Sequence, residues 1–172
     1  MNHEAISREA LSCEEFLRLA AEGYNRIPVT LETFADLDTP LSIYLKLANG
    51  PYTYLLESVQ GGERFGRYSI IGLSSPTRIV VQGHQVLVLT GNRIAEREDD
   101  TNPLELIGKY MKRFRAAPQA GLPRYCGGLV GCFGYDTVRY IEKKLTRTTK
   151  ADDLGTPDIV LLLSEEIAVV DN

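Results

Sequence analysis

Apolar positions with helical spacing occur in three places along the chain. The predicted helices cover residues 12–23, 39–50 and 102–114. The first begins at Ser12, whose hydroxyl and the side chain of Glu15 match a capping box. The second has Pro40 at its first helical position, where the missing N–H costs nothing. Amphipathic helices of this kind pack one face against a core.

Strand-like runs rich in β-branched and aromatic residues occupy most of the remaining sequence. They cover residues 27–34, 52–59, 68–73, 77–82, 85–90, 127–135 and 158–171, the last as one strand or two. Tight turns are predicted at Gly83-His84 and Gly91-Asn92. Short turns join antiparallel strands, since a parallel crossover needs a dozen residues or more. The fold class is therefore α+β: a largely antiparallel β-sheet, expected as half of a β-sandwich, with flanking helices.

Composition narrows the range of functions. The 172 residues fit one domain, and 44% hydrophobic with 24% charged residues is typical of a soluble globular protein. The net charge of −4 comes without a basic stripe, so we expect no nucleic-acid partner. The longest apolar run, residues 159–163, is too short to span a bilayer, so no membrane partner is expected either. Three cysteines without CxxC spacing favour reduced thiols and a cytoplasmic location, and Cys126 and Cys132 are expected to be small buried side chains.

A catalytic set is not evident. Of the two histidines, His3 is near the terminus and His84 is expected on a solvated turn. The glycines of residues 127–134 do not fit a dinucleotide-binding loop and are expected to mark a bulge or the close approach of another backbone. The acidic run at residues 96–100 is expected to be a solvated turn. We therefore predict neither catalytic nor metal-binding residues in this chain.

A candidate amino-acid site lies between the strands at residues 52–59 and 68–73. Glu57 has the charge to pair with an α-ammonium group, and Ser58, Ser69 and Arg67 have the donors for an α-carboxylate. Leu56 offers an apolar wall. Successive strand residues face opposite sides, so Glu57 and Ser58 share one pocket only if the strand ends or bulges there. The alternative is a hairpin whose polar residues simply mark the exit into solvent.

Three blocks of sequence resemble anthranilate synthase component I. Residues 55–58, LLES, followed after ten residues by Ser69, match the family's tryptophan-site signature. Residues 66–69, GRYS, match its usual continuation. Residues 127–142, GGLVGCFGYDTVRYIE, are similar to a further family block in which tyrosine is common at the position of Cys132.

The resemblance implies the function. The family converts chorismate and ammonia, delivered from glutamine by an amidotransferase subunit, to anthranilate and pyruvate in tryptophan biosynthesis, with Mg²⁺ bound. The chorismate and metal residues lie in a C-terminal domain, and we expect that domain to be absent from this chain. Residues 1–172 then form the N-terminal, tryptophan-binding domain, which we expect to be inactive alone. Alternatives are the N-terminal part of aminodeoxychorismate synthase component I and a stand-alone amino-acid-binding module.

Overall fold

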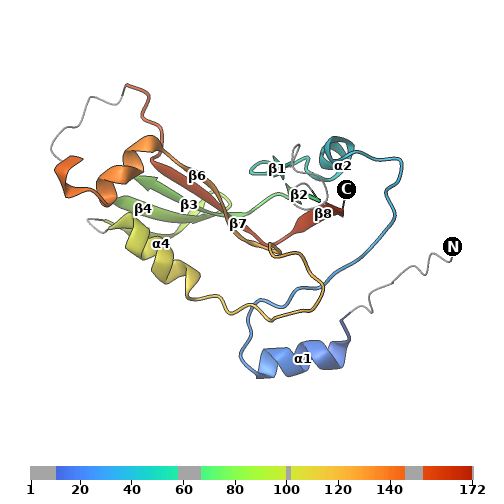
Figure 1. Ribbon diagram of the computed structural model, residues 1–172. Coiled ribbons are helices and arrows are strands. Elements are labelled where there is room, and N and C mark those ends of the chain that lie inside the picture. Colours follow the sequence, from blue (N-terminus) through green and yellow to red (C-terminus); the bar gives the residue numbers. More distant parts are fainter. Residues whose placement is uncertain (1–10, 58–66, 100–101, 146–152, 172) are drawn as a thin grey trace. The chain divides into compact units, whose positions relative to one another are not determined.

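The computed structural model describes residues 11–57, 67–99, 102–145 and 153–171 (Figure 1). The chain divides into two compact units. The helical unit comprises residues 1–37 and 109–126, and the sheet unit comprises residues 38–108 and 127–172. The helix α4, Pro103–Met111, begins in the sheet unit and ends in the helical unit.

The larger sheet of the sheet unit contains five antiparallel strands in the order β5-β4-β3-β7-β6. Their bounds are β3 Thr77–Gln82, β4 Gln85–Thr90, β5 Arg93–Glu98, β6 Gly128–Phe133 and β7 Ile159–Ser164. The central strands supply the core, with Ile79, Val81, Val86 and Ile159 exposed by 1% or less. Burying each such side chain contributes about 1.5–3 kcal/mol, so the sheet is stabilised chiefly at β3, β4 and β7.

The predicted tight turns form at both positions. Gly83 has φ 56° between β3 and β4, and Gly91 has φ 58° between β4 and β5. Positive φ at the first turn residue favours glycine and matches the twist of a hairpin. The strand β5 was not predicted, because its acidic residues indicated a solvated turn. Glu96 and Glu98 instead lie on this strand, which corrects that interpretation.

A second sheet contains three antiparallel strands in the order β1-β2-β8. They are β1 Tyr54–Leu56, β2 Tyr68–Gly72 and β8 Ile167–Asp171, and the helix α2, Pro40–Leu47, packs against β1 and β2. The segment predicted as one strand or two is two, because Glu165 and Glu166 are exposed and separate β7 from β8. The α+β class with largely antiparallel pairing is thus confirmed, with the strands divided between two sheets (Figure 1).

The helix ends agree with the predicted capping in part. In α1, Cys13–Ala21, the Ser12 hydroxyl accepts from the N–H of Glu15 at 3.1 Å. The carboxylate of Glu15 binds Arg18 instead of reaching back, so this capping box is only half formed. A complete capping box occurs at α2, between Thr39 and Ser42. Asn102 caps α4 by accepting from the N–H of Leu104 at 3.1 Å.

The strand predicted at residues 27–34 is wrong. These residues form no strand, and Val29, Leu31 and Phe34 are 69%, 94% and 84% exposed. The only ladder contact described nearby is an isolated bridge between Arg26 and Ala116. Alternating polarity is not sufficient for a strand, because a strand also needs a neighbour that accepts its backbone hydrogen bonds.

Candidate ligand-binding site

The predicted amino-acid site lies at one end of the β1–β2 pair. Leu56, the last residue of β1, is paired with Ile70, and Glu57 follows as an exposed residue outside the strand. Ser69 precedes Ile70 on β2, so it lies at the same end of the sheet. Ser58 and residues 59–66 fall outside the described residues. The structure therefore places Leu56, Glu57, Arg67 and Ser69, and the prediction for Ser58 stays a prediction.

The pleat of the sheet divides the predicted site residues between two faces. Paired residues share a face, so Leu56 and Ile70 lie on one side of the sheet. Ser69 is adjacent to Ile70 in β2 and faces the other side, together with Leu55 and Ile71. Leu56 and Ser69 therefore do not line the same face of this sheet.

Ser69 is fully buried, with 0% of its surface exposed. The neighbouring Ile71 on the same face is also 0% exposed, while Leu56 is 48% exposed. A small molecule arriving from solvent meets Leu56 and Glu57 first. Its carboxylate reaches the Ser69 hydroxyl only when the covering side chains move, so direct contact requires local rearrangement.

The guanidinium of Arg67 already holds a carboxylate. Its Nε lies 2.6 Å from Oδ1 of Asp171 and its second terminal nitrogen 2.7 Å from Oδ2, in a two-pronged pair between the ends of β2 and β8. The hydrogen bond with Asp171 raises the pKa of Arg67 above its usual range. The pair of Arg67 and Asp171 is exposed to solvent. A ligand carboxylate that displaced Asp171 would therefore replace one solvent-exposed ion pair of Arg67 with another. The fork of Arg67 is thus occupied by Asp171, a partner that sequence reasoning missed, and its role toward a ligand stays a prediction.

Tyr54, at the other end of β1, connects the two sheets. Its hydroxyl lies 2.7 Å from the Ser164 hydroxyl on β7, and its ring occupies the space where a side chain on Gly72 would be. Ser164 is 4% exposed. The contact depends on the register that pairs Tyr54 with Gly72, and local sequence carries no signal for that register.

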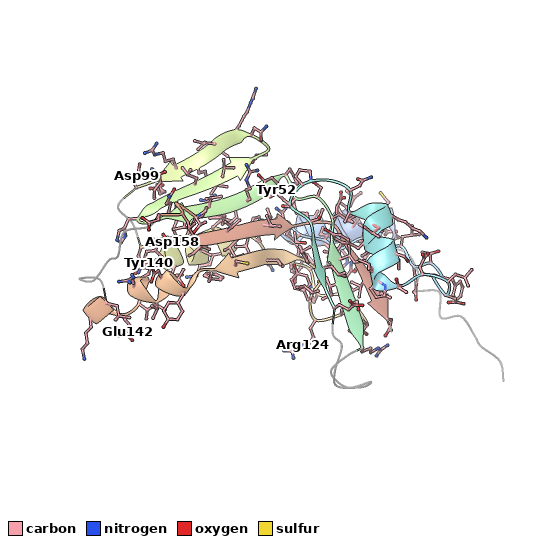
Figure 2. The ribbon with its side chains drawn as sticks, turned by 90° about the horizontal axis from the view of Figure 1, so that it is seen from above. Tyr52, Asp99, Arg124, Tyr140, Glu142 and Asp158 are labelled. Atoms are coloured by element: carbon pink, nitrogen blue, oxygen red, sulfur yellow. The ribbon has the colours of Figure 1, made fainter. Side chains whose placement is uncertain are left out.

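A polar cluster lies at the opposite end of the larger sheet, where the GYDTVRYIE block folds into a 3₁₀-helix, η1, Tyr135–Tyr140. The Tyr140 hydroxyl lies 2.6 Å from the carbonyl oxygen of Gly83 and 2.9 Å from Oδ2 of Asp158 (Figure 2). Gly83 donates its N–H to the same carboxylate oxygen at 2.7 Å. The exposed ring of His84 stacks edge-on at 5.8 Å from Tyr140. The cluster joins η1 to the β3–β4 turn through these hydrogen bonds.

The cysteine prediction is wrong in part. Cys126 and Cys132 are exposed, as is Cys13, and all three are free thiols. Cys132 lies on β6, the outermost strand of its sheet, so it does not contribute to the core. The apolar strand pattern indicated burial, but an edge strand has only one neighbour to cover it.

The described residues include neither a cluster of metal ligands nor a membrane-spanning helix, and one hollow lies outside the predicted site. Within the described ranges, no three histidine, cysteine or acidic side chains converge as metal ligands. None of the helices described is long and apolar enough to cross a membrane. A hollow of about 370 Å³ lies in the helical unit, lined by Leu19, Thr30 and Gln119 among others, and it contains none of the predicted site residues.

Comparisons with known proteins agree with the sequence motifs. No family model matches the chain. The chain is 56% identical over 159 residues to anthranilate synthase component 1 of Pseudomonas aeruginosa, which is 92% of this chain and 32% of that protein. For the protein of the same name from Neisseria meningitidis serogroup C, identity is 56% over 165 residues, 94% of this chain and 33% of that protein.

More distant matches carry the same name. Anthranilate synthase component 1 of Acinetobacter calcoaceticus is 41% identical over 164 residues, 94% of this chain and 33% of that protein. A crystal structure of anthranilate synthase component I from Streptococcus pneumoniae aligns with a TM-score of 0.47 and 23% identity, over 83% of this chain and 29% of that one. The chain spans about a third of the length of the curated relatives it matches. The predicted resemblance is therefore confirmed: along nearly its whole length, this chain is a relative of anthranilate synthase component I.

Proposed function

We propose that this chain is the regulatory, tryptophan-binding portion of an anthranilate synthase component I. The observation that carries the proposal is the 56% identity over 92% of the chain to proteins of that name, together with an intact LLES signature at residues 55–58. The complete protein is proposed to act as a lyase that converts chorismate and ammonia to anthranilate and pyruvate. The chain alone is proposed to be inactive.

The described geometry supports an amino-acid ligand at the end of β1 and β2 that carries Leu56 and Ser69. Exposed Glu57 has the charge to pair with the α-ammonium group, and half-exposed Leu56 has the apolar surface for part of the indole. Arg67 offers its fork to the α-carboxylate in competition with Asp171. Ser58 and Ser69 are proposed to donate hydroxyl hydrogen bonds to the carboxylate, with Ser69 becoming accessible on rearrangement. Bound tryptophan inhibits only if it favours a less active state over an active one.

The remaining components of the reaction are proposed to come from outside this chain. They are a C-terminal chorismate-binding domain, a glutamine amidotransferase subunit that supplies ammonia, and Mg²⁺ with its ligands. The three exposed free thiols support a reducing compartment, so we propose a cytoplasmic location.

The test uses the complete protein that carries this segment, assayed for anthranilate with chorismate and ammonia. In the Ser58→Ala variant, the tryptophan concentration for half-inhibition should rise by about 10- to 100-fold, the equivalent of one hydrogen bond to a charged group. Activity without tryptophan should stay unchanged, because Ser58 is assigned to the inhibitor and not to the substrate.

Ser74→Ala is the matched control, since Ser74 is an exposed serine of the same unit whose hydroxyl binds the carbonyl of Pro51. It should leave inhibition unchanged. Equal inhibition of the parent protein and Ser58→Ala would refute the site assignment. A product other than anthranilate, such as aminodeoxychorismate, would refute the assigned reaction while leaving the family relationship intact.

A further inference from the structure

The outer edge of β6 carries an unusual sequence for an exposed strand. β6 is the last strand of the five-stranded sheet, and no strand among the described residues pairs with its outer side. Its six residues, GLVGCF, include no charge and no proline. Exposed edges normally carry charges, proline or bulges, because an unprotected edge recruits other strands. The composition of β6 is that of a strand with neighbours on both sides.

The backbone groups that face the open edge can be assigned from the pairing with β7. Gly134 donates its N–H to the carbonyl oxygen of Asp158 at 2.7 Å, in register with that pairing. Backbone direction alternates along a strand, so Cys132 and Val130 also direct their groups toward β7. The intervening residues present N–H and C=O at the open edge: Leu129, Gly131 and Phe133.

The opposite edge of the same sheet is protected. β5 carries Arg93, Glu96, Arg97 and Glu98, and its pairing with β4 is interrupted by a register shift at Val88/Leu89. Charges and a bulge both prevent a further strand from pairing. One sheet thus has a closed edge and an open one, so the lack of protection at β6 is specific to that strand.

We propose that the outer edge of β6 pairs with an extended, uncharged segment of the longer protein, from the two-thirds of the relatives' length that this chain does not span. The inference rests on the proposed function, which makes this chain one portion of such a protein. Two observations support this occupant: the matched relatives are about three times as long, and 54%-exposed Phe133 lies at the end of the open strand. A partner strand provides hydrogen bonds for three N–H and three C=O groups and covers the phenyl ring.

Hydrogen–deuterium exchange, resolved by residue, tests the pairing. In the 172-residue chain the outward amides of Leu129, Gly131 and Phe133 should exchange rapidly, while the inward amides of Val130 and Cys132 are protected. In the longer protein the outward amides should exchange at least about 100-fold more slowly, because a paired edge opens only with its sheet. The inward amides are the internal control for folding of β6 in both proteins.

A pair of variants gives a second measurement. Phe133→Lys on β6 and Ile94→Lys on β5 replace apolar residues that are 54% and 56% exposed on opposite edges of one sheet. In the longer protein, Phe133→Lys should lower the unfolding midpoint and accelerate exchange of the outward amides, and Ile94→Lys should do neither. In the 172-residue chain the two variants should behave alike.

Two results would overturn the proposal, and a third separates it from the proposed reaction. Equally fast exchange of the outward amides in both proteins would show that nothing pairs with β6. Slow exchange already in the 172-residue chain, accompanied by a dimer in sedimentation, would identify a second copy as the occupant and refute the assigned one. A longer protein that makes no anthranilate but protects the outward amides would refute the proposed reaction and leave the pairing standing.

Discussion

At the scale of single residues, the close approach of the β6 and β7 backbones requires glycine at position 131. A Cβ on Gly131 would lie 1.9 Å from the carbonyl oxygen of Val160 and 2.9 Å from the Cα of Leu161. These atoms belong to the neighbouring strand β7 and cannot move without disturbing its ladder. The interpretation of the glycine block as a place of close backbone approach is confirmed at this residue.

Two glycine substitutions should therefore have opposite effects. Gly131→Ala should lower the free energy of unfolding by about 1–3 kcal/mol, because the methyl group forces β6 and β7 apart. Gly108→Ala, in the interior of α4 with no atom within 4 Å of its added Cβ, should raise it by about 0.5–1 kcal/mol through helix propensity. Urea unfolding of both variants measures the difference. Equal effects would contradict the steric explanation.

The Tyr54–Ser164 contact gives a second residue-scale prediction. Tyr54→Phe removes a hydroxyl that lies 2.7 Å from the buried hydroxyl of Ser164, and should cost about 1 kcal/mol. Ser164→Ala should cost a similar amount, and the double variant less than the sum, because the two side chains share one interaction. A double-mutant cycle of unfolding free energies measures the coupling. Strict additivity would show that the hydroxyls do not interact.

At the scale of elements, the 3₁₀-helix η1 depends on the β3–β4 turn for its position. Tyr140, its last residue, binds both the turn carbonyl of Gly83 and the carboxylate of Asp158. Within η1, Arg139 pairs with Asp136 at 3.0 Å and donates to the carbonyl of Leu145 at 2.6 Å. The polar residues of this family block thus determine how a short helix lies against a hairpin, and the exposed His84 stacks on the same phenol.

The phenol of Tyr140 should make stability dependent on alkaline pH. Burial, and then the hydrogen bond to Asp158, raise its pKa above the ordinary value of 10.0. The phenol stays neutral in the folded protein at pH values where it ionises in the unfolded chain. Its contribution to the free energy of unfolding is therefore complete below about pH 10 and is lost as the pH rises further. In urea unfolding between about pH 8 and 11.5, the free energy of unfolding should fall more steeply with pH in the parent protein than in Tyr140→Phe.

Tyr135→Phe is the matched control for that series, since Tyr135 is 94% exposed and begins the same 3₁₀-helix. Its stability should follow the pH dependence of the parent protein. If Tyr140→Phe loses stability as steeply as the parent above pH 10, the alkaline sensitivity arises elsewhere and the assignment to Tyr140 is wrong.

At the scale of the whole molecule, the two units differ in how much core they form. The sheet unit contains most of the fully buried side chains, whereas residues 29–37 of the helical unit include exposed apolar residues such as Leu31 and Leu37. Large exposed apolar side chains in a row usually mark a surface that another part of a protein covers. This distribution agrees with a chain that spans about a third of its relatives' length.

Calorimetry of the 172-residue chain should show the consequence for ligand binding. Tryptophan should bind weakly, with a Kd of about 0.1 mM or higher, because Ser69 is closed off and Arg67 is held by Asp171. Phenylalanine is the control and should give a smaller signal still. Arg67→Ala should weaken binding further. Tight binding of both amino acids alike would contradict a site selective for tryptophan.

Local sequence correctly predicted several strands, turns and helix starts, because these depend on interactions within a few residues. The strands β3 and β4 and their turn have the predicted bounds, since β-branched runs and a glycine with positive φ act over a few residues. The starts of α2 and α4 were likewise predicted from Pro40 and Asn102. The family relationship was evident from contiguous blocks, which comparison with relatives confirmed.

Tertiary structure alone decided the features that depend on strand neighbours. Register placed Leu56 and Ser69 on opposite faces, brought Asp171 to Arg67, and set the ring of Tyr54 over Gly72. Strand order left Cys132 exposed on an edge, and residues 27–34, which have no partner strand in the described part of the chain, are irregular. The local pattern of polar and apolar residues carries no information about hydrogen bonds between distant segments. Sequence patterns therefore predict the helices and strands but not which residues contact each other.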